Sequence, residues 1–89
     1  MFAVVVRLEL SEGPTIEQAR QMLETQVIPM VKQSPGFAAG FWLAPAGHDG
    51  LSFLIYEDEQ SARAMAGSLH SRPQAKLLSV EVREVVASA

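Results

Sequence analysis

Hydrophobic residues recur along the chain with two different periods, and together these predict four strands and two helices. A period of two marks strands over residues 2–10, 37–45, 51–57 and 79–86. These segments are rich in β-branched or aromatic residues, which favour extended structure. The two longer segments between them have a helical period. The expected order is therefore strand, helix, strand, strand, helix, strand.

The first helix is expected to begin after Thr15, because Thr15 and Gln18 have the spacing of a capping box. Its apolar positions recur every three or four residues and predict one buried side. That side consists of Ile16, Ala19, Leu23, Val27 and Met30. Pro29 lacks a backbone N–H and should kink the last turn. The Ser-Pro-Gly sequence at 34–36 should end the helix.

The second helix is expected over residues 59–70, with Asp58 as its N-cap. Turns are expected at 11–15 and at 45–50, where Asp-Gly closes a hairpin. The connection over residues 70–78 is assigned to neither period.

This order of elements predicts one α+β domain over residues 1–89. Two split βαβ units form a ferredoxin-like βαββαβ sandwich, with a four-stranded antiparallel sheet and both helices on one face. Right-handed connections favour the strand order 4-1-3-2.

Both sides of the expected sheet are apolar, and this predicts a partner. The side under the helices is expected to hold Phe2, Val4, Val6, Phe37, Phe41, Leu43, Leu51, Phe53, Ile55, Val80 and Val82. The other side is expected to hold Ala3, Val5, Arg7, Ala38, Gly40, Trp42, Ser52, Leu54, Tyr56, Glu81, Arg83 and Val85. A sheet that faces water should be polar there. A homodimer through this side is expected, with the small residues leaving room for partner side chains or for a cavity.

Composition excludes several classes of function. The net charge is −3 with no basic stripe, so no nucleic-acid partner is expected. Cysteine is absent, so there is neither a disulfide framework nor a thiolate metal site, and a cytoplasmic location is expected. No signal peptide or membrane span is expected, because Arg7 and Glu9 interrupt the first apolar run.

The chain resembles the dimeric α+β barrel superfamily, most closely the antibiotic-biosynthesis-monooxygenase-like (ABM) group. The resemblance rests on IPMVKQSPGFAAGFWLAP, on LSFLIYEDEQSARAM and on the closing VEVREVV. It implies a dimeric α+β barrel in which each subunit has a cavity. Members of the group include cofactor-independent oxygenases of polycyclic phenols and heme-degrading proteins.

The heme-degrading members use an Asn early in the first strand, a Trp, and a His late in the second helix. Here the first strand has no Asn, and the chain's only Trp, Trp42, lies in the second strand. Only His70 matches by position, so this site is not carried over and no spectral change with hemin is expected.

Four residues are candidates for lining a ligand cavity, and each has a structural alternative. Trp42 and Tyr56 can stack on a planar ligand or pack in the dimer interface. Arg7 can bind a phenolate oxygen, or it can pair with Glu81 or with an acid across the dimer. His70 can transfer protons, or its charge can favour the helix C-terminus.

Three functions follow from these features. The first is a cofactor-independent monooxygenase that acts on an aromatic or phenolic small molecule, with no metal and no organic cofactor. The second is a non-catalytic ligand-binding or scaffold dimer. The third is heme binding or degradation. His48 is interpreted as a hairpin residue beside Asp49, and no catalytic residue is assigned.

Overall fold

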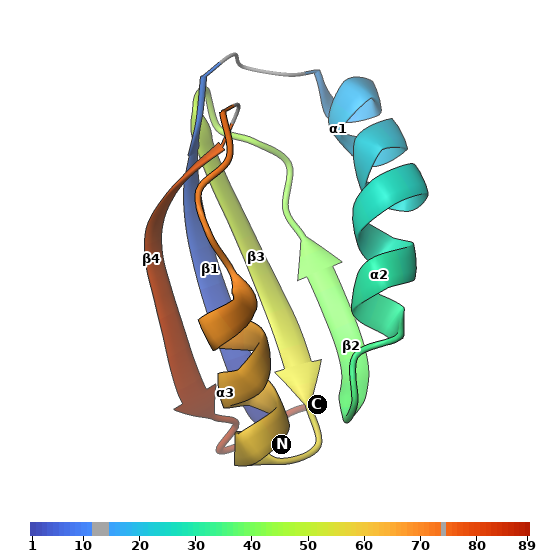
Figure 1. The fold of residues 1–89 in the computed structure, drawn as a ribbon, viewed down its shortest axis with the longest axis vertical. Helices are drawn as coiled ribbons and strands as arrows, with labels where there is room; N and C mark the ends of the chain where they lie inside the picture. The colour runs from blue at the N-terminus through green and yellow to red at the C-terminus, as the bar shows by residue number, and fades with distance from the viewer. Residues whose placement is uncertain (12–14, 74) are drawn as a thin grey trace.

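The computed structural model describes residues 1–11, 15–73 and 75–89, and it confirms the predicted order of elements. The elements are β1 (Phe2–Leu10), α1 (Ile16–Met22), η1 (Leu23–Val27), α2 (Ile28–Lys32), β2 (Phe37–Trp42), β3 (Asp49–Tyr56), α3 (Glu59–Ser68) and β4 (Ala75–Glu84). Figure 1 shows the helices on one side of the sheet, with α1, η1 and α2 forming one continuous rod.

The described strands form one antiparallel sheet in the order β2-β3-β1-β4, which confirms the predicted order 4-1-3-2. β4 begins at Ala75, so part of the unassigned connection is strand. The hairpin between β2 and β3 closes with a bridge between Ala46 and Asp49, and Gly47 takes a positive φ of 65°. The turn expected at 11–15 falls partly on residues 12–14, which lie outside the described residues.

Side chains cap both helical segments as predicted. The Thr15 hydroxyl accepts the Gln18 N–H at 3.1 Å, and the Gln18 side chain accepts the Thr15 N–H at 3.0 Å, completing a capping box. The Asp58 carboxylate accepts the Ser61 N–H at 2.8 Å at the start of α3.

The expected effect of Pro29 takes a specific form. It lies in the first turn of α2, directly after the π-helical turn η1, where the Ile28 N–H bonds to the carbonyl of Leu23, five residues back. Pro29 cannot donate to an earlier carbonyl, and a wider turn beside it accommodates both the missing donor and the ring. The rod therefore continues to Lys32 instead of breaking.

The pairing register shows which side of the sheet is the core. Val4 pairs with both Leu54 and Val82, and cross-strand partners point to the same side of a sheet. Leu54 and Val4 belong to one buried cluster together with Val31 of α2 and Ala62 of α3. Both helical segments therefore cover this face, which we call the helix face.

The predicted sides of β2 and β3 are wrong, because both strands are turned over relative to the expectation. Ser52, Leu54 and Tyr56 face the helices, with exposed fractions of 8%, 3% and 0%. Gly40 and Trp42 pair with Leu54 and Ser52, so they face the helices too. The opposite side, which we call the open face, carries Ala3, Val5, Arg7, Ala39, Phe41, Leu51, Phe53, Ile55, Ser79, Glu81 and Arg83.

A bulge explains the inversion in β2. The register with β3 shifts between Phe37 and Ala39, so Ala38 is an extra residue. Phe37 packs against the core, whereas Phe41 lies on the open face and is 56% exposed. Strict alternation would put both rings on one side.

The open face stays largely apolar after this correction, and its side chains are bulkier than predicted. Phe41 is exposed there and pairs with Phe53, which in turn pairs with Val5. Ile55 lies on the same face, two residues along β3 from Phe53. No helix in the described part of the chain is long and apolar enough to cross a membrane.

Candidate functional site

Trp42 lies on the helix face, and its indole covers Gly40 two residues earlier on the same strand. A Cβ built on Gly40 would lie 2.7 Å from the indole Cη2 and 3.3 Å from the ring of Phe37. A side chain at position 40 would therefore displace the indole. The small residue in β2 leaves room for the chain's own tryptophan rather than for a partner or an empty cavity.

Tyr56 is fully buried, and its hydroxyl belongs to a short hydrogen-bonded chain. It lies 2.7 Å from the Ser34 hydroxyl, which also bonds to the carbonyl of Val31. A carbonyl only accepts, so Ser34 donates its one hydrogen to Val31 and accepts from Tyr56. The phenol also packs edge-on against Phe37, with ring centroids 5.8 Å apart. Tyr56 thus holds the end of α2 on the sheet, and its hydroxyl is not free to contact a ligand.

Burial raises the pKa of the Tyr56 phenol above its ordinary value of 10.0. A hydrogen bond donated by Ser34 would oppose this, but the hydrogen of Ser34 is directed to Val31. In the unfolded chain the phenol ionises near its ordinary value. The stabilisation from the neutral phenol is therefore complete below about pH 10 and is lost as the pH rises through the folded pKa.

Phenolate absorbance reports on Tyr56 alone, because it is the only tyrosine. In the native protein we expect this absorbance to rise only above pH 10. Tyr56→Phe is expected to cost about 1 kcal/mol at neutral pH, for the lost hydrogen bond. It should also remove the phenol's share of the decline in the free energy of unfolding above pH 10, which urea titrations at several pH values will measure. A native phenolate midpoint at or below 10 would contradict this assignment.

Arg7 lies on the open face, across the sheet from Trp42 and Tyr56, so the predicted single cavity containing all three residues is wrong. Its guanidinium is 3.5 Å from the Asp49 carboxylate, and both side chains are about half exposed. The expected alternative partner, Glu81, instead pairs with Arg83 at 3.1 Å. Exposed pairs of this kind contribute little to stability.

A groove of about 230 Å³ lies between the helical rod and the end of β2. Its lining is mostly apolar and consists of Ile16, Ala19, Arg20, Leu23, Glu24, Ile28, Trp42, Leu43, Ala44 and Pro45. The π-helical turn supplies part of one wall, and π turns occur frequently at functional sites. Trp42 is therefore the predicted cavity residue that lines a groove in the structure.

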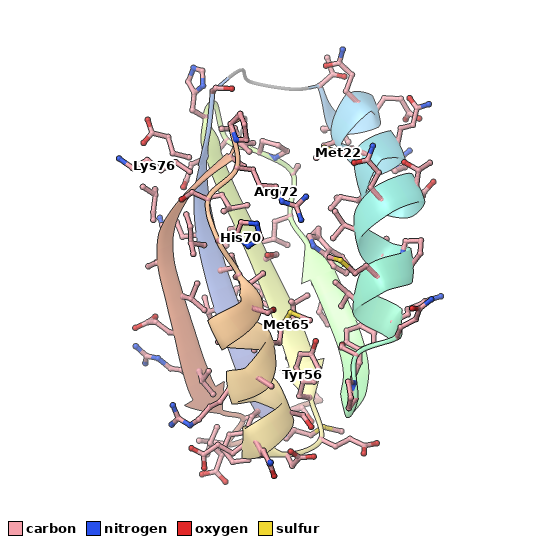
Figure 2. The ribbon with its side chains drawn as sticks, in the orientation of Figure 1. Met22, Tyr56, Met65, His70, Arg72 and Lys76 are labelled. Atoms are coloured by element: carbon pink, nitrogen blue, oxygen red, sulfur yellow. The ribbon has the colours of Figure 1, made fainter. Side chains whose placement is uncertain are left out.

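His70 follows α3, and its side chain is exposed. Its Nδ1 lies 3.3 Å from the carbonyl of Ser68, a long hydrogen bond in which the nitrogen donates. The lone pair is then on Nε2, which is the nitrogen available to a ligand or metal. Figure 2 shows Tyr56, Met65, His70 and Arg72 following one another along the middle of the helix side, between α3 with its following segment and the rod.

His48 has the same type of hydrogen bond in a different place. Its Nδ1 is 2.7 Å from the carbonyl of Leu10, at the tip of the β2–β3 hairpin. It lines a shallow, open depression of about 250 Å³ with Glu9, Ala46, Asp49 and Leu78. The described residues contain no group of three histidine, aspartate or glutamate side chains placed to hold a metal ion.

The structure thus leaves Trp42 and His70 as candidates on the helix side and separates Arg7 from them. It adds Met65 and Arg72, which sequence reasoning missed. Met65 lies within the second predicted helix, where no sequence feature singles it out, and Arg72 lies in the connection over residues 70–78, which matched neither period. No signal in the sequence alone places Arg72 beside His70 on the helix side.

Neither a family model nor a curated protein sequence matches the chain. Among solved structures, the chain is similar to a mutant of MhuD crystallised with two manganese protoporphyrin IX molecules bound per active site. The TM-score is 0.63 and the sequence identity is 17%, and the match covers 100% of this chain and 98% of that chain. The similarity shows the ferredoxin-like α+β fold.

Proposed function

We propose that this chain binds a planar tetrapyrrole of the protoporphyrin class on the helix side of its sheet, where His70 would hold the central metal. The observation that carries the proposal is the position of His70. It is exposed on the helix side, with Nδ1 bonded to the carbonyl of Ser68 and no hydrogen bond to Nε2 from the residues that the structure describes.

The hydrogen bond of His70 matches the environment of a metal-binding histidine. Such residues usually donate the second ring N–H to a carbonyl or carboxylate, which fixes the orientation of the ring. Here the carbonyl of Ser68 accepts from Nδ1, although at a long distance of 3.3 Å. The neutral imidazole is the commonest protein ligand of transition metals.

The surroundings of His70 suit an apolar, flat molecule. Met65 is half-buried on α3 and lies near His70 along the helix side (Figure 2). The rod also exposes two methionines, Met22 at 49% and Met30 at 54%, and a mostly apolar groove lies between the rod and Trp42. Methionine adapts to ligand shape, and aromatic side chains stack on planar rings.

The similar fold of MhuD supports the class of ligand, because that structure holds manganese protoporphyrin IX. Heme binding or degradation is the third of the three functions inferred from the sequence, because the first strand lacks the expected Asn and Trp42 lies in the second strand. Ligation through a single histidine requires neither of those residues. When bound, a heme iron would supply the redox chemistry that the side chains lack.

A titration with hemin tests the proposal, with the chain's second histidine as the matched control. Wild-type protein is expected to shift the Soret band and to bind hemin at one saturable site. His70→Ala is expected to weaken binding about tenfold or more and to alter the Soret maximum, because the residue that would hold the iron is lost. His48→Ala should behave as wild type. Equal behaviour of the two variants, or no shift in wild type, would overturn the proposal.

We also propose that a second copy of the chain covers the open face. Phe41 is 56% exposed there and pairs with Phe53, and Ile55 lies on the same face two residues along β3. Contiguous apolar surface of this kind is unusual on a monomer and is typical of interfaces. Two sheets stacked face to face by a two-fold axis would shield both open faces.

Oxygenation of a phenol without a cofactor stays a prediction of the resemblance. Of its three proposed ligand residues, Trp42 lines the groove, Arg7 faces the other side of the sheet, and the hydroxyl of Tyr56 is engaged with Ser34. Oxygen uptake with a panel of phenols and quinols measures this activity directly.

A further inference from the structure

Arg72 is fixed at its backbone although it lies outside the strands and helices. Its N–H donates to the carbonyl of Ala75 at 2.9 Å, and the N–H of Ala75 donates back to its carbonyl at 3.1 Å. Next to it, the Ser71 hydroxyl accepts the N–H of Leu77 at 2.9 Å. The segment after His70 is therefore tied to the start of β4, and the base of the Arg72 side chain has a defined position.

The guanidinium of Arg72 has no acidic partner among the described residues, in contrast to the other arginines. Arg7, Arg20, Arg63 and Arg83 each form an ion pair with a carboxylate, at distances from 2.7 to 3.5 Å. Arg72 is exposed, and no ion pair in the described part of the chain engages it. Its charge and its fork of donors are available to a ligand.

The side chain of Arg72 points toward the same part of the helix side as that of His70. Figure 2 shows the guanidinium over the middle of the helix side, near His70 and toward the rod. Lys76 provides the contrast. Lys76 is also exposed and forms no ion pair with the described residues, but its side chain points away from the helix side. In the register of the sheet, Lys76 of β4 lies opposite Glu9 of β1.

We propose that Arg72 binds a carboxylate of the ligand and so fixes the orientation of the ligand on the helix side. This inference rests on the proposed function. It specifies that the ligand is an apolar plane with carboxylates at its polar end. A planar guanidinium matches a carboxylate with two parallel hydrogen bonds. The apolar surface near Met65 would hold the ring, while Arg72 selects acids over neutral analogues of the same shape.

The test uses metal-free protoporphyrin IX and its dimethyl ester, which differ in charge and share the ring. Binding is followed by quenching of Trp42, the only tryptophan. Arg72→Gln is expected to weaken binding of the diacid about tenfold or more and to reduce its dependence on salt, because charge-assisted hydrogen bonds are lost. Binding of the ester should be unchanged, and Lys76→Gln should match wild type with both ligands.

Each other outcome overturns the role of Arg72. Equal losses in Arg72→Gln and Lys76→Gln would show general electrostatic attraction. An equal loss for acid and ester would show a structural effect. Unchanged binding of the diacid by Arg72→Gln, with tight binding by wild type, would remove this residue's role and leave the proposed function standing. No binding of either porphyrin by wild type would overturn the role of Arg72, whereas the proposed function is decided separately by the hemin titration, in which His70 has a metal to bind.

Discussion

Replacing Leu54 by alanine is expected to lower the free energy of unfolding by about 2–5 kcal/mol. Leu54 is 3% exposed on the helix face and pairs with Val4, which is fully buried. Removing its side chain leaves a cavity among residues that cannot all close around it. Because domains of this size are stable by only about 5–15 kcal/mol, the variant should unfold at clearly lower urea concentration.

Ile55 provides the matched control, because it is the next residue and lies on the open face. In the monomer, Ile55→Ala should lower the free energy of unfolding less than Leu54→Ala does. If a second copy covers the open face, the effect of Ile55→Ala should change with protein concentration. Urea denaturation of both variants at two protein concentrations makes the comparison. The opposite ranking would support the side assignment predicted by strict alternation and would contradict the structure.

Replacing Phe41 by aspartate is expected to dissociate the proposed dimer. The exposed ring lies on the open face beside Phe53, so the new carboxylate would be buried without a partner in the interface. An uncompensated buried charge costs about 3–5 kcal/mol, which raises the dissociation constant about 100-fold or more. Light scattering coupled to size exclusion should report a dimer for wild type and a monomer for the variant.

Met30→Asp is the control for this experiment. Met30 is 54% exposed, nearly the same as Phe41, but it lies on α2, away from the open face. It introduces the same charge at an equally exposed apolar residue and should leave the dimer intact. A monomeric wild-type protein at micromolar concentration would contradict the proposed interface.

Local sequence signals predicted the order of elements well, because each signal has one strong physical cause. Thr15 and Gln18 cap the first helix, and Asp58 caps the second. The hairpin lies within the predicted turn, although Gly47 and His48 form its tip and the Asp-Gly sequence begins β3. The order of the strands followed from the connection rules.

The sides of β2 and β3 could not be predicted, because both sides of these strands are apolar and alternation alone does not choose between them. Ala38 adds a residue that shifts the alternation in β2. Tyr56 enters the core because Ser34, 22 residues earlier, meets its hydroxyl there. A contact between residues so distant in sequence leaves no local trace.

The candidate site was predicted only in part, because residue types can be identified from the sequence but the side of the sheet on which they lie cannot. Trp42 and His70 were identified by residue type, and the structure places both on the helix side, although Trp42 was predicted on the opposite side of the sheet. Grouping Arg7 with them depended on the inverted strands, and the register separates it. Arg72 emerges from a tertiary arrangement, the bridge to Ala75 and the absence of an acidic neighbour in the described residues.

In the proposed function the two faces of the sheet have separate tasks, with the ligand on the helix side and the partner on the open face. A hemin titration of the Phe41→Asp variant, followed at the Soret band, tests this division most directly. We expect the monomeric variant to bind hemin with the spectrum and affinity of wild type. Loss of hemin binding by a folded Phe41→Asp monomer would contradict it.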